Sequence, residues 1–370
     1  MQLCPLSSVR QRLTLGAPLP FNVRNADRTL LLARGQVIRC ENQMQALFER
    51  GALVDLDDLP PRGPDPASCP REALVELWDR TVDRLGRILK SSVHADFLAA
   101  LNESAAPLIA LIERDPDLAI FQIVRHESAG RTHPGVAHSV HTAIAVRLAG
   151  QRLGWDAHML RSSFRAALTM NLSILELEGR LATQATPLNA AQREAIDMHP
   201  LRSAEILQSA GITDAIWLGA VAQHHEVDGG TGYPRRLHSV HEAAALVRRA
   251  DAYTTMLSAR AAMKPQDAAR ALYLDEQGHP MAAALVKEFG IYPPGCCVRL
   301  ASGEMGIVVK RGPASNTPIV AIVVNRLGEP LLAPVRRSTA KPELAIVDVV
   351  AESRLKVRVS REQLALLGGD

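Results

Sequence analysis

The sequence predicts a multidomain, mostly helical protein with a small β/α unit before the helices and a small β domain after them. Three observations predict this class. Apolar residues recur at helical spacing through most of residues 71–290. A proline-rich stretch precedes them, and short β-branched runs separated by turn residues follow from position 296. A chain of 370 residues also exceeds one ordinary core, which favours several domains.

The N-terminal unit is expected to span residues 1–57. Its elements are a short strand at 30–33 and a helix over 43–51 that ends at a glycine. A linker at 58–70 follows, because four prolines within 60–66 prevent both helix and central strand.

Amphipathic stripes predict the helices of the central region. The segment 71–127 is expected to pack on the core, and 128–295 is expected to form the main helical domain. The stripes run over 74–89, 97–112, 137–153, 159–177, 191–210, 215–223, 241–257 and 265–273. A helix-bundle core accounts for most of their apolar residues.

The hydrophobic period changes near Tyr292-Pro293-Pro294-Gly295. Short strands are predicted at 298–300, 306–309, 319–324, 331–333 and 346–350, and a helix at 361–367. Residues 296–370 are therefore expected to form a small β domain with a short C-terminal helix.

Composition limits the partners and the compartment. The net charge of +3 is a small excess that does not favour nucleic acid but permits a small anionic ligand. No apolar run is long enough for a secretory or membrane-spanning segment. Five scattered cysteines fit a reducing cytosol, with adjacent Cys296 and Cys297 as small core residues. A cytoplasmic protein without a membrane partner is the expectation.

The most informative motif lies at 224–234. His224-His225-Glu226 runs into a glycine-rich turn closed by Gly232-Tyr233-Pro234. Imidazole is the commonest protein ligand of transition metals. Adjacent histidines in one helical turn are about 100° apart, so both reach one cavity only if it is wide, as a polynuclear metal site is.

Other candidate ligands occur upstream and downstream of this motif. His138 lies in a helical pattern, and His199 precedes Pro200 at what is expected to be a helix boundary. Asp251 lies in a strongly apolar helix, where a buried carboxylate needs a metal or an arginine as partner. Four histidines and an aspartate spread over helices are the ligand set of a helical metallohydrolase.

These residues resemble the HD-GYP family, the cyclic di-GMP phosphodiesterase branch of the HD superfamily. The resemblance covers about residues 128–290 and implies a helical HD-GYP bundle that hydrolyses cyclic di-GMP to pGpG or GMP with two or three iron or manganese ions. It rests on His138-Ser139, His199-Pro200, His224-His225-Glu226, Gly232-Tyr233-Pro234, and Asp251 with Arg260 downstream.

The resemblance also implies roles for individual residues. His138, His199, His224, His225 and Asp251 match the family's metal ligands. Arg260 and Lys264 match residues near the ligand phosphates. Gly232-Tyr233-Pro234 matches the loop that contacts partners or shapes the site.

One departure concerns the family's defining His-Asp pair, which falls here at Met170-Asn171, with Ile174 in place of a phosphate-facing lysine. A bridging carboxylate neutralises two dications, and Asn171 is neutral. A methionine thioether matches iron or manganese poorly. The centre is therefore expected to hold one ion or none rather than two, and hydrolysis is expected to be impaired.

Three functions fit these residues. The first is a signalling role without hydrolysis, by binding cyclic di-GMP or a related nucleotide, or by docking a diguanylate cyclase domain through the Gly232-Tyr233-Pro234 loop. The second is an active phosphodiesterase with a remodelled metal site, in which Glu226 is a candidate base, a solvated carboxylate or a residue that supports the metal ligands without contacting the ion. The third is an interaction scaffold that binds no nucleotide. A homodimer formed through helices such as 71–92 fits each of them.

Overall fold

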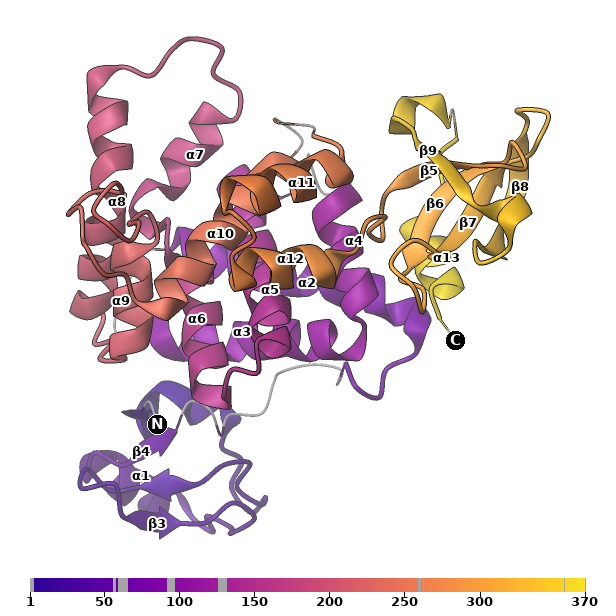
Figure 1. Ribbon diagram of the computed structural model, residues 1–370. Coiled ribbons are helices and arrows are strands. Elements are labelled where there is room, and N and C mark those ends of the chain that lie inside the picture. Colours follow the sequence, from indigo (N-terminus) through magenta and orange to yellow (C-terminus); the bar gives the residue numbers. More distant parts are fainter. Residues whose placement is uncertain are drawn as a thin grey trace.

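The computed structural model describes residues 3–55, 58, 66–91, 97–125, 132–258, 261, 263–355 and 357–369. In these ranges the chain is mostly helical, with a small antiparallel sheet near each end. The two sheets lie at separate edges of the helical body (Figure 1). The predicted fold class is confirmed at this level, and most of the predicted linker falls outside the described residues.

The N-terminal unit is a four-stranded sheet with one α-helix. Its elements are β1 (Leu3–Pro5), β2 (Val23–Arg24), β3 (Leu30–Leu32), α1 (Glu41–Glu49) and β4 (Leu53–Asp55). The strand order is β1-β4-β2-β3 and every pairing is antiparallel. The sequence predicted β3, from its run of three leucines, and α1. It did not predict β1, β2 and β4, because strands of two or three residues are too short to show a period of two.

The helical body is built around α5, which packs against α2, α4, α6, α10 and α12. Four consecutive α5 residues, 143–146, are fully buried, as expected for a helix covered on all sides. The helices are α2 (Leu74–Lys90), α3 (Phe97–Arg114), α4 (Pro116–Arg125), α5 (Pro134–Arg152), α6 (Ala157–Thr169), α7 (Leu175–Leu181), α8 (Ala190–Ser209), α9 (Ala215–Gln223), α10 (Glu242–Leu257), α11 (Pro265–Asp275) and α12 (Pro280–Phe289).

Two predictions about the helices are wrong in ways that matter for the site. The stripe at 159–177 is not one helix, because the backbone leaves the helical region at Asn171, with φ −106° and ψ 17°, and a 3-10 turn leads into α7. His199 is not at a helix boundary. It lies within α8, which continues through Pro200.

The C-terminal unit is a five-stranded antiparallel sheet in the order β8-β7-β6-β5-β9. Its elements are β5 (Cys297–Leu300), β6 (Met305–Lys310), β7 (Ile319–Val324), β8 (Pro330–Ser338), β9 (Ile346–Val349) and α13 (Arg361–Leu367). Each predicted strand is present, and β8 is longer than predicted. Both faces of β7 are buried, since Ala321 belongs to one apolar cluster and Ile322 to another.

Three smaller expectations can be compared with the structure. The apolar stripe of α2 is buried against α3 and α5, and the homodimer expected through helices such as this one stays a prediction. No disulfide forms among the cysteines of the described ranges, and Cys296 and Cys297 are buried as predicted. Among the described helices, none combines the length and hydropathy that crossing a membrane requires.

Candidate metal centre

Three histidines converge between α8 and the end of α9. One ring nitrogen each of His199, His224 and His225 lies within 4.8 Å of the other two. The Nε2 atoms of His199 and His224 are 3.0 Å apart. Both side chains are buried, with His199 2% and His224 0% exposed. We call these three residues the histidine trio.

The His199-Pro200 pair explains how the first ring is held. Pro200 has no N–H, so it cannot donate to the carbonyl of Ile196, four residues earlier in α8. The Nδ1–H of His199 donates to that carbonyl instead, at 2.5 Å. His224 Nδ1 likewise donates to the Val221 carbonyl at 2.7 Å, in the last turn of α9. Carbonyls only accept, so both Nε2 atoms present lone pairs.

Two lone pairs that face each other at 3.0 Å require a positive charge. Burial lowers the pKa of His199 to about 4 and that of His224 well below its usual value, so neither ring supplies that charge near neutral pH. A ring whose other N–H is bonded to a carbonyl is the usual state of a metal-ligating histidine. The histidine trio therefore fits a transition-metal ion.

The Gly232-Tyr233-Pro234 loop packs on the third ring. Tyr233 stacks on His225 with ring centroids 4.7 Å apart and an interplanar angle of 16°. The Tyr233 N–H donates to the His225 carbonyl at 3.1 Å. A Cβ on Gly232 would lie 2.4 to 2.5 Å from backbone atoms of the 225–227 segment, so glycine is required there. The loop therefore shapes one wall of the centre.

Glu226 holds this loop. The sequence left it as a base, a solvated carboxylate or a support for the metal ligands, but it is 1% exposed, so the solvated position is wrong. Its two oxygens accept from the backbone N–H groups of Arg235, at 2.6 Å, and Leu237, at 3.0 Å. The carboxylate ties the residues after the loop back to the histidine segment.

His138 and Asp251 form an ion pair beside the trio. His138 Nε2 and Asp251 Oδ1 are 2.7 Å apart. Burial opposes a charge on His138, but Asp251 outweighs this and raises its pKa to about 9. Burial would raise the pKa of Asp251, yet His138 holds it well below its usual range. The side chain paired with Asp251 is thus a histidine rather than the predicted arginine, and its predicted role as a metal ligand stays a prediction.

Positions 170 and 171 lie inside the protein at the end of α6. Met170 is 0% and Asn171 is 5% exposed. Asn171 Nδ2 donates to Oε1 of Glu178 in α7 at 2.8 Å. Burial raises the pKa of Glu178 to about 7. Glu178 was not among the predicted site residues, although an acidic residue among the leucines of 175–181 could have indicated a buried carboxylate.

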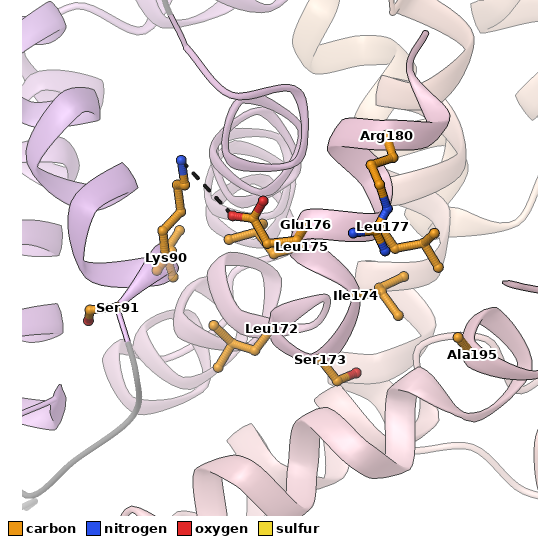
Figure 2. Close-up of a pocket in the computed structure, with 11 residues that line it drawn as sticks. Lys90, Ser91, Leu172, Ser173, Ile174, Leu175, Glu176, Leu177, Arg180 and Ala195 are labelled. Carbon is orange, nitrogen blue, oxygen red and sulfur yellow. Dashed lines mark ion pairs between the residues drawn. The ribbon is translucent and has the colours of Figure 1, made fainter. Parts of the chain in front are cut away.

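A cavity of about 340 Å³ opens beside position 174 (Figure 2). Ile174 forms part of its apolar wall, and Lys90 lies across from it, 4.0 Å from Glu176. Ala195 of α8 also lines the cavity, one helical turn before His199. The cavity thus reaches α8 one turn from His199, and none of the three histidines is among the residues that line it.

The two predicted phosphate-binding residues have different outcomes. Arg260 lies outside the described residues. Lys264 is exposed at the start of α11, and its charge acts on the thiol of Cys296, where the C-terminal unit begins. The structure thus places Lys264 beside that unit, and its role toward phosphates stays a prediction.

Comparison with known proteins supports the resemblance. No family model matches the chain. The chain is 25% identical over 249 residues to the cyclic di-GMP phosphodiesterase PA4108 of Pseudomonas aeruginosa. The aligned region is 65% of this chain and 57% of that protein, so the chain spans just over half the length of this curated relative. The match supports an HD-GYP domain.

A solved structure described as Bd1817, an HDG"Y"P protein from Bdellovibrio bacteriovorus, aligns over 77% of this chain and 97% of that chain, with a TM-score of 0.47 and 16% identity. At this level it adds no argument about chemistry. Within the region that resembles the HD-GYP family, the structure brings His199, His224 and His225 together and places His138 and Asp251 beside them.

Proposed function

We propose that this chain is an HD-GYP signalling module that binds one metal ion at the histidine trio and cyclic di-GMP or a related nucleotide beside it, with impaired hydrolysis. One observation carries the proposal: position 171, where the family has its bridging carboxylate, is a buried neutral amide that is hydrogen-bonded to Glu178. A two-metal centre needs a group that holds its ions about 3.5–4 Å apart. An amide supplies no charge for this.

The residues that would hold the ion are His199, His224 and His225, and the resemblance favours iron or manganese. When bound, such an ion polarises a phosphoryl oxygen as a Lewis acid. The charge of His138 is balanced by Asp251, so the attraction for a nucleotide phosphate would come from the ion held at the trio. The cavity beside Ile174, with its apolar wall and Lys90, offers space for another part of the nucleotide. The relative from Pseudomonas aeruginosa is a cyclic di-GMP phosphodiesterase, which supports cyclic di-GMP as the ligand class.

Calorimetry and a turnover assay on the whole chain test this proposal. With Mn²⁺ or Fe²⁺ present, we expect cyclic di-GMP to bind and to remain uncleaved. The double variant Met170→His with Asn171→Asp restores the family's pair, and we expect it to raise the metal content measured by elemental analysis. Rapid metal-dependent cleavage by the unaltered chain would contradict the impairment.

The second candidate function is an active phosphodiesterase with a single ion. The three convergent histidines favour it, because three protein ligands with an open position characterise many catalytic zinc sites. In the same assay, this function predicts turnover that disappears in His224→Gln.

Partner docking is tested separately from nucleotide binding. The inner side of the loop holds His225, whereas Arg235 and Arg236 after it are exposed. A diguanylate cyclase domain that docks here is expected to lose affinity when both arginines are changed to glutamate. An interaction scaffold without nucleotide would give no heat with cyclic di-GMP.

A further inference from the structure

Glu178 and Asn171 form a buried polar contact that the proposed function does not use. Asn171 Nδ2 donates to Glu178 Oε1 at 2.8 Å. A carboxylate only accepts, so the amide must present its nitrogen to Glu178. The orientation of the Asn171 amide is therefore fixed, and its oxygen Oδ1 is directed away from Glu178 Oε1.

Two oxygens of this contact are buried without a hydrogen-bond partner among the described residues. They are Asn171 Oδ1 and Glu178 Oε2, and Asn171 itself is 5% exposed. Leaving a buried acceptor unpaired is unfavourable, and more so when the group is charged. Such oxygens are stabilised by a cation or by an ordered water.

A second carboxylate adds to this negative site. Gly135, which Glu178 contacts, lies three residues before His138 in α5, and His138 is paired with Asp251 at 2.7 Å, so both carboxylates lie along the same part of α5. One positively charged histidine thus has two carboxylates to balance, and like charges at close range repel. Carboxylate and amide oxygens are the ligands that hard dications prefer.

The backbone around Glu178 leaves room for its carboxylate. A Cβ on Gly135 would lie 2.7 Å from Glu178 Oε2, so a larger residue there would displace the side chain. Gly135 lies in the first turn of α5, where the helix dipole favours an anion. These features keep a carboxylate in a buried position next to residue 171.

We propose that Glu178 supplies the carboxylate that position 171 lacks. Glu178 and Asp251, with the amide oxygen of Asn171, bind a second dication such as Mn²⁺ that is held more weakly than the ion at the histidine trio. The inference rests on the proposed function for the ion at the trio. It assigns a metal-binding role to a residue of α7 that lies seven positions after the degenerate pair.

Titration of the metal-free whole chain with Mn²⁺ alone tests the inference, with the paramagnetic resonance of free Mn²⁺ as readout. We expect a tight and a weaker site in the unaltered chain. Glu178→Gln keeps the side-chain volume and the acceptor for Asn171, and should weaken the second site about tenfold or more. Glu176→Gln, on an exposed residue of the same helix, is the matched control and should change nothing.

A charge exchange checks that the effect is specific. Asn171→Asp combined with Glu178→Gln returns the carboxylate to position 171 and should restore the weaker site. A single Mn²⁺ site in the unaltered chain, or an unchanged titration in Glu178→Gln, would overturn the inference. His224→Gln removes the tight site only, so loss of the ion at the trio is distinguishable from loss of the ion at Glu178. Thermal melting verifies that each variant is folded.

Discussion

At the scale of single residues, the His199-Pro200 pair shows how a sequence change in a helix prepares a ligand. The proline removes one backbone donor, and the preceding imidazole donates to the carbonyl that is left. That bond fixes the proton on Nδ1 and directs the Nε2 lone pair toward His224. The hydrogen bond that the helix loses at Pro200 is thus replaced by one that fixes His199 in the tautomer suited to metal binding.

The buried histidines predict how stability depends on pH. The pKa of histidine is about 6.5 in an unfolded chain, but about 4 for His199 and well below its usual value for His224 in the folded protein. Between pH 6.5 and 4 these two side chains therefore bind more protons in the unfolded chain, so their contribution to the free energy of unfolding of the metal-free protein falls as the pH falls, whereas the raised pKa values of His138 and Glu178 act in the opposite direction. We expect His199 to contribute a loss of about 2 kcal/mol between pH 7.5 and 5, and His224 to add to it in the same direction.

Thermal melting in a chelator at these two pH values measures this loss. His224→Gln cannot titrate and should reduce the difference in Tm between the two pH values. His238→Gln, on an exposed residue, serves as the control and should leave the difference as it is. Equal pH dependence in all three proteins would show that the buried rings do not contribute.

At the scale of elements, the break after α6 decides what the site contains. The apolar stripe at 159–177 predicted one helix, and periodicity could not reveal that the chain turns at Asn171. The turn aims α7 back toward α5 and brings Glu178 beside Asn171. A carboxylate thus reaches the site from an element whose position was wrongly predicted, which is why counting along the motif missed it.

The loop after α9 gives a prediction at this scale. Gly232→Ala places a Cβ within 2.5 Å of the backbone of residues 225–227, so the loop or the His225 segment must move. We expect a cost of about 3 kcal/mol in the free energy of unfolding and weaker metal binding at the trio, measured by urea denaturation and Mn²⁺ titration.

Gly219→Ala is the matched control for that change. Gly219 lies in α9 and a Cβ there meets nothing within 4 Å, so alanine should be neutral or stabilise by up to about 1 kcal/mol. If Gly232→Ala were as stable and bound Mn²⁺ as tightly as Gly219→Ala, the loop would not hold His225 in the way described.

At the scale of the whole molecule, the sequence predicted the elements that carry an extended apolar pattern and missed several that lack one. Extended apolar stripes located α2, α5, α8 and α10, and β-branched runs located the C-terminal sheet. The other three N-terminal strands, β1, β2 and β4, and the helix α12 lacked such patterns. The histidine trio was foreseeable from motifs, whereas the ion pair of His138 with Asp251 depends on packing between α5 and α10, which one sequence does not display.

The C-terminal unit is fixed to the helical body by charged contacts, which leads to a prediction for the whole chain. Arg311, just after β6, donates to Asp117 at 2.6 Å and to the Glu288 side chain at 2.7 Å. Arg311 is about a quarter exposed, and both carboxylates are more buried. Arg311→Met would leave two carboxylates without this partner, so we expect a loss of about 2 kcal/mol.

Urea denaturation of the whole chain measures this loss, with Arg299→Met as the control. Arg299 pairs with Asp348 at 3.6 Å within the sheet, and both side chains are well exposed. Exposed pairs contribute about 0–1 kcal/mol, so this variant should unfold near the midpoint of the unaltered chain. If Arg311→Met also unfolded there, the charged contacts would not hold the sheet on the helices, and the apolar contact of Phe121 with the sheet core would be its main attachment.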